Sequence, residues 1–185
     1  NNMNKTNPYK KMRDSVYVRG YMSMIKGDYN SALDFLKLSE TRSCSWDDMR
    51  KLELHFSLGV CYKNLSRQDE QLHYVENAIL EYDNVIILAK KIVEKSNSNS
   101  GYYKHKAIRS YNQIINLFCK LTRYEHAKQK CTEFIAEIKD GWLKGAELIN
   151  GKKVSTEYCE LSLLEFELLN VLTNYKDKNS FCEIY

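Results

Sequence analysis

The stretch Gly20–Leu36, with the sequence GYMSMIKGDYNSALDFL, decides the fold of this chain. On both sides of the break Gly27-Asp28-Tyr29, apolar residues recur every three or four positions, which is typical of amphipathic helices. The break itself contains glycine and aspartate, which favour turns. Gly20 and Ala32 stand twelve positions apart, one in each expected helix, and such small residues let two helices approach closely. The stretch therefore predicts a helix, a tight turn and a second helix.

The helical period continues along the chain. Ser45 is the expected N-cap of a third helix that has Asp47 and Asp48 in its first turn, after a polar loop over residues 40–45. A short turn is expected at Ser66-Arg67, and residues 146–154 fit either a small hairpin or a ragged helix end. One proline and seven glycines in 185 residues argue against an all-β fold. We therefore expect an all-α fold with helices over residues 9–25, 30–39, 45–64, 69–94, 102–121, 124–138 and 156–174.

The helix pairs repeat, and the repeats carry a family resemblance. The second pair contains Leu58-Gly59 and Tyr62, and the third contains Tyr111, Ile114, Phe118, Tyr124 and Ala127. Together with Gly20 and Ala32, these positions make the chain resemble tetratricopeptide-repeat proteins, which pair two helices per ~34 residues. The resemblance implies helix-turn-helix repeats stacked as a short superhelix. No repeat is complete, so other α-solenoids and an irregular α-bundle stay open as alternatives.

The composition of the chain and the spacing of its cysteines indicate how many domains it has and in which cellular compartment it resides. We expect one helical domain over residues 1–185, with a linker near 95–101 where Ser96–Gly101 contains only turn formers. The chain begins with Asn1 rather than Met, which is typical of a fragment. It lacks both the apolar core of a signal peptide and the ~18-residue apolar run of a membrane span, so we expect an intracellular protein, cytoplasmic or nuclear, without a membrane partner. Its six cysteines contain no Cys-x-x-Cys pair and are expected to be reduced.

Sequence motifs of catalysis are missing. The four histidines, which are His55, His73, His105 and His126, are scattered and show no metal-ligand spacing. The sequence has no glycine-rich phosphate loop. We therefore expect no enzyme, no metal and no cofactor.

The resemblance implies a concave groove lined by the first helix of each pair, which binds a peptide or the flank of a partner subunit. Asn112 and Asn116 are one turn apart, and their amides are suited to pairing with a peptide backbone, although both also fit exposed polar positions. Tyr17, Tyr21 and Phe56 fit pocket anchors, or alternatively the core between repeats. The expected partner-binding residues are Tyr17, Tyr21, Met24, Phe56, Val60, Lys63, Arg109, Asn112, Asn116 and Lys120.

Two alternative functions remain open. The first is a permanent scaffold subunit of a larger complex, which would use outer faces as well as the groove. The second is nucleic-acid contact through the basic cluster at 103–109, where Lys104, His105, Lys106 and Arg109 follow Tyr102 and Tyr103. The net charge of +4 is too mild to indicate nucleic acid by itself, so a protein or peptide is the expected partner.

Overall fold

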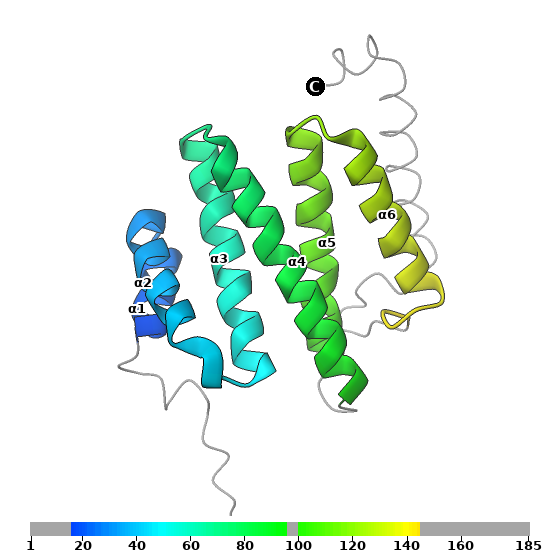
Figure 1. The fold of residues 1–185 in the computed structure, drawn as a ribbon, viewed down its shortest axis with the longest axis horizontal. Helices are drawn as coiled ribbons and strands as arrows, with labels where there is room; N and C mark the ends of the chain where they lie inside the picture. Colours follow the sequence, from blue (N-terminus) through cyan, green and yellow to red (C-terminus); the bar gives the residue numbers. More distant parts are fainter. Residues whose placement is uncertain (1–15, 96–99, 145–185) are drawn as a thin grey trace, which may run out of the picture. The chain divides into compact units, whose positions relative to one another are not determined.

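The computed structural model describes residues 16–95 and 100–144, and over these residues the chain is helical and has no strand (Figure 1). The elements are α1 (Val16–Ile25), α2 (Tyr29–Thr41), the short 3₁₀ helix η1 (Ser43–Ser45), α3 (Asp48–Gln68), α4 (Leu72–Lys95), α5 (Ser100–Lys120) and α6 (Tyr124–Lys139). The expected all-α fold of packed, neighbouring helices is confirmed. The segments 1–15, 96–99 and 145–185 lie outside the described residues, and with them the expected start of the first helix, the hairpin or helix end at 146–154 and the helix over 156–174.

The chain forms two compact units, and their boundary falls inside α4. The first unit runs to Glu81 and the second begins at Tyr82. From the sequence we expected one domain with a linker near 95–101. Of that linker, Ser100 and Gly101 belong to the first turn of α5, and residues 96–99 lie outside the described residues.

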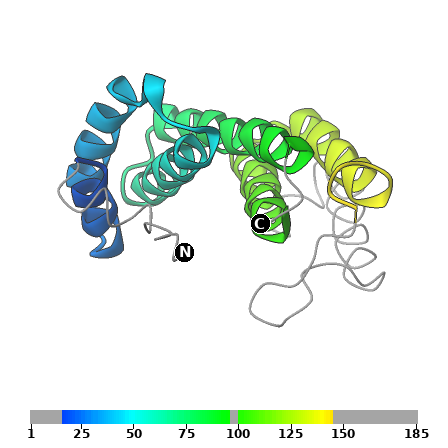
Figure 2. The ribbon, with the colours of Figure 1, turned by 90° about the horizontal axis from the view of Figure 1, so that it is seen from below.

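A close helix contact forms the first pair. Figures 1 and 2 both show α1 beside α2. The turn between them uses Gly27 at φ +80°, a backbone conformation that glycine adopts without steric cost. Asp28 caps α2 by accepting a hydrogen bond from the backbone N–H of Ser31 at 3.2 Å. Gly20 and Ala32 are both buried, and Gly20 packs against Leu36 of α2 so closely that a Cβ atom added to it would be 2.9 Å from Leu36 Cγ.

The third helix differs at both ends from the expectation. Asp47, and not Ser45, is its N-cap, because the Asp47 carboxylate accepts the N–H of Arg50 at 2.9 Å while Ser45 belongs to η1. The turn expected at Ser66-Arg67 is helical instead. Ser66 donates its hydroxyl to the carbonyl of Lys63 at 2.6 Å, which satisfies that hydroxyl without ending the helix. The helix ends at Gln68 and the Ser66-Arg67 expectation is wrong.

Aromatic packing and a polar network hold the second unit together. The rings of Tyr111 on α5 and Phe134 on α6 are stacked with centroids 4.8 Å apart, and both side chains are almost fully buried. Tyr111 donates its hydroxyl to Glu133 at 2.9 Å. Lys130 on α6 bridges Glu133 at 3.3 Å and Asp83 on α4 at 2.6 Å. These contacts tie α5, α6 and the C-terminal part of α4 together within the second unit.

No disulfide joins the four cysteines of the described residues. Cys61 and Cys131 are buried, and burial raises the pKa of each thiol to about 12. Cys44, by contrast, is exposed. No helix within residues 16–95 and 100–144 has the length and apolar character needed to cross a bilayer.

Candidate functional site

Two of the predicted aromatic anchors lie inside the first unit. Tyr17 and Phe56 are both buried. The Tyr17 hydroxyl lies 3.5 Å from the Ser57 hydroxyl on α3, and its ring meets Trp46 edge-on at a centroid distance of 5.9 Å. For these two residues the structure therefore shows packing between helices, the alternative that the sequence left open.

An apolar surface remains exposed one turn further along α1. Tyr21, Met22 and Ile25 are 39%, 48% and 61% exposed. We call these three residues the α1 surface. The Tyr21 ring stacks on the buried Tyr17 ring at a centroid distance of 6.3 Å, and this contact helps to fix the orientation of Tyr21. Large apolar side chains clustered on one exposed helix are typical of protein-binding surfaces.

The remaining predicted residues of the first unit are intermediate in exposure. Met24 on α1 and both Val60 and Lys63 on α3 are half-buried. The sequence analysis did not name Met22 and Ile25. Their signal was present, because α1 is apolar on nearly every side, whereas a helix with only one buried face needs fewer apolar residues.

In the second unit, the predicted residues form a polar face on α5. Arg109, Asn112, Asn116 and Lys120 follow one another at intervals of three, four and four residues, which places them on one side of the helix. Asn112 is half-buried and the other three are exposed. We call these four residues the α5 face. It carries two cationic groups and two amides.

The residues of the basic cluster at 103–109 make separate contacts within the second unit. Tyr103 is buried, and Lys106 lies over the Tyr102 ring at 5.5 Å from its centroid. Lys104 donates to the backbone carbonyl of Lys144 at 3.0 Å. Burial, with the charges of Arg109 and Lys106, lowers the pKa of His105 below its ordinary value. Of the two tyrosines of the cluster, Tyr103 is therefore packed inside and Tyr102 is 39% exposed.

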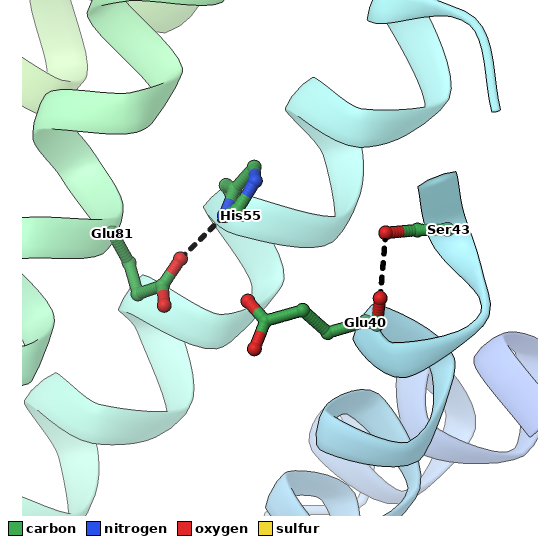
Figure 3. Close-up of polar contacts among 4 residues, drawn as sticks. All are labelled: Glu40, Ser43, His55 and Glu81. Carbon is green, nitrogen blue, oxygen red and sulfur yellow. Dashed lines mark hydrogen bonds and ion pairs between the residues drawn. The ribbon is translucent and has the colours of Figure 1, made fainter. Parts of the chain in front are cut away.

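Three ionisable side chains from three helices meet elsewhere in the first unit. Figure 3 shows Glu40 of α2, His55 of α3 and Glu81 of α4 with their polar ends turned toward one another. His55 Nδ1 lies 2.5 Å from a Glu81 carboxylate oxygen. One nitrogen or oxygen atom from each residue lies within 4.8 Å of the others. We call this group the Glu40–His55–Glu81 cluster.

Local structure holds each member of the cluster in place. Glu40 lies in the last turn of α2, where Ser43 donates its hydroxyl to the Glu40 carbonyl at 2.8 Å. Glu81 is only 8% exposed, so its carboxylate depends on protein partners rather than on water. His55 supplies one such partner. The arrangement therefore has two oxygen-bearing groups and one imidazole around a shared space.

The electrostatics of the cluster are dominated by burial and by like charge. Burial raises the pKa of Glu40 above its ordinary value, the negative charge of Glu81 raises it further, and His55 and Lys37 oppose the shift. Nearby Tyr62 is affected in the same direction, since burial and the carboxylates of Glu81 and Glu40 raise its pKa to about 12. The region is thus one where an added positive charge would be stabilised.

Comparisons of the chain with protein-family models, with curated proteins and with solved structures find no match. The resemblance to tetratricopeptide-repeat proteins therefore rests on the residues quoted above and stays a prediction.

Proposed function

We propose that the chain is a non-catalytic protein-interaction module that holds a peptide or the flank of a partner subunit. The observation that carries the proposal is the α1 surface, where Tyr21, Met22 and Ile25 expose apolar area on one short helix. Burying such side chains against a partner contributes roughly 25 cal/mol per Å² of apolar surface removed from water. Chemistry on the ligand is not part of the proposal.

The mode of binding follows from what each surface offers. The α1 surface supplies apolar anchors, and an aromatic such as Tyr21 loses little conformational entropy when it is bound. The α5 face supplies amides that both donate and accept, so it is suited to the backbone of an extended segment. We treat the two surfaces as separate contributors, each within its own unit.

Peptide display on the purified full chain tests the proposal. A random peptide library is selected against the wild-type chain, and the enriched peptides are then tested against chains altered at one surface. We expect enriched peptides with apolar anchors that no longer bind after Tyr21→Ala/Ile25→Ala. Enrichment of nothing, or enrichment of peptides that bind both chains equally, would contradict the proposal.

The α5 face has its own test. Asn112→Ala/Asn116→Ala removes both amides and keeps the two cations Arg109 and Lys120. If the amides contact the peptide backbone, the double variant should bind every selected peptide more weakly than the wild type does, whatever the side chains of the peptide. If the folded double variant retains every peptide and every partner captured by the wild type, these two residues are not part of the binding surface.

The scaffold alternative is favoured by a different observation. Leu72 and Leu80 on α4 are 55% and 57% exposed, and neither lies on a helix expected to line the groove. A scaffold subunit would bury such positions in a permanent complex. Under the scaffold alternative, selection from the peptide library would enrich no peptide. Native purification would instead recover the chain in an assembly that stays intact at high salt.

A further inference from the structure

We propose that Glu40, His55 and Glu81 bind one divalent cation of the zinc type, which ties α2, α3 and the N-terminal part of α4 together. The donor atoms come from three helices and lie within 4.8 Å of one another. The donor set is one imidazole nitrogen and two carboxylates. Imidazole and carboxylate are both established zinc ligands, and three protein ligands leave one tetrahedral position for water.

The charge balance at the cluster favours a cation. Two carboxylates face the same space, and the Glu81 side chain is only 11% exposed. A buried carboxylate is costly unless it is paired or bound to a metal. Glu40 also lies in the last turn of α2, where the helix dipole adds negative potential. One imidazole can offer at most one positive charge to the two carboxylates, so the cluster as a whole keeps negative charge to be neutralised.

Neighbouring groups offset the unfavourable environment of the Glu40 carboxylate without cancelling it, because its pKa stays raised although His55 and Lys37 oppose the shift. Lys37 affects Glu40 electrostatically, yet its ammonium lies over the Tyr62 ring, 5.7 Å from the centroid. Tyr62 itself stays protonated well beyond neutral pH, because its pKa is raised to about 12. It therefore adds no charge to the cluster at neutral pH.

The side chains need only a small adjustment to bind the metal. Two ligands held about 2.1 Å from zinc at a tetrahedral angle lie roughly 3.4 Å apart. The His55 Nδ1–Glu81 separation, 2.5 Å, is shorter than this and has to widen, whereas the largest separation in the cluster, at most 4.8 Å, has to shrink by about 1.4 Å. Glu40 is an exposed residue with a flexible side chain, so a change of rotamer can close the distance without moving a helix.

Calorimetric titration of the full, chelator-treated chain with Zn²⁺ tests the proposal, with Mg²⁺ titrated in parallel. We expect one Zn²⁺ per chain and no measurable Mg²⁺ binding, because an imidazole ligand favours zinc. Glu40→Gln and His55→Gln are each expected to weaken Zn²⁺ binding by about ten-fold or more. Asp34→Asn is the matched control, since it removes one carboxylate from an exposed position of the same helix.

The six cysteines are an alternative source of zinc binding, and Co²⁺ separates the two. A cobalt ion held by nitrogen and oxygen shows ligand-field bands without the strong thiolate-to-cobalt charge-transfer absorption. We expect that spectrum in the wild type and its loss in Glu40→Gln. Glu40 is exposed, so this variant folds even if His55→Gln does not.

Three results would overturn the proposal. They are no Zn²⁺ binding by the wild type, equal affinity in Glu40→Gln and Asp34→Asn, and a Co²⁺ spectrum dominated by thiolate charge transfer. Thermal unfolding adds an independent readout. Saturating Zn²⁺ should raise Tm by about 4 °C or more in the wild type, and by much less in Glu40→Gln.

Discussion

Gly20 and Leu36 lie so close across the first helix pair that a Cβ atom added to Gly20 would be 2.9 Å from Cγ of Leu36. Leu36 is fully buried, and the added atom would also lie 3.1 Å from Cβ of Phe35. Neither neighbour is the free end of a long side chain. The contact therefore requires glycine for its size.

Replacing Gly20 should destabilise the fold although alanine is the better helix former. Alanine favours a helix by about 1 kcal/mol over glycine, whereas overpacking a core costs about 1–3 kcal/mol. We expect Gly20→Ala to lower the free energy of unfolding by about 1 kcal/mol and Gly20→Val by more. Urea denaturation measures both. Adding Leu36→Ala should offset part of the Gly20→Ala effect, and strict additivity would show that the contact is not the cause.

The N-cap of α3 gives a second prediction. Asp47→Ala removes the acceptor for the Arg50 N–H and should lower the free energy of unfolding by about 1 kcal/mol. Ser45→Ala is the control, and it should change stability by less than about 0.5 kcal/mol because Ser45 lies outside α3. Chemical denaturation of the two variants in parallel checks the assignment. If Ser45→Ala lowered the free energy of unfolding by more than Asp47→Ala does, Ser45 would be the N-cap, as the sequence predicted.

Stability should fall at alkaline pH because of the buried thiols. The pKa of Cys61 and of Cys131 is raised from 9.0 to about 12 in the folded chain. Between these values the folded thiol keeps its proton while the unfolded thiol loses it, so the free energy of unfolding decreases as pH rises. We expect the decline to begin near pH 9 and to become shallower in Cys131→Ala. Stability that stays level to pH 11 would contradict this account.

The sequence predicted the helix pairs because their signals are local. Gly20, Ala32 and the Gly27-Asp28 turn lie within one short segment, and their spacing alone indicates two helices in close contact. The choice between Ser45 and Asp47 was not decided locally. Both are good N-caps followed by acidic residues, and only the 3₁₀ turn of η1 places Asp47 at the start of the helix.

The candidate sites depend on which side of each helix is covered. Tyr17 and Tyr21 are four residues apart and share a face, so periodicity cannot tell which of them a third helix will bury. In the structure Trp46 and Ser57 cover Tyr17, and Tyr21 stays exposed.

The Glu40–His55–Glu81 cluster had no sequence signal at all. His55 and Glu81 are 26 positions apart on different helices, and only tertiary packing brings their side chains together. Metal sites with short, regular ligand spacing are found from sequence, whereas a site shared by three helices is found only from coordinates.

Fluorescence anisotropy of a labelled, display-selected peptide on the full chain tests the central claim most directly. Ile25→Lys alters the α1 surface, and Leu80→Lys makes the same change at a position of similar exposure, 57% against 61%. The account predicts that Ile25→Lys raises the Kd by about ten-fold or more, while Leu80→Lys leaves it within two-fold of the wild type. Equal Kd values for Ile25→Lys and the wild type, with both chains folded by circular dichroism, would contradict it.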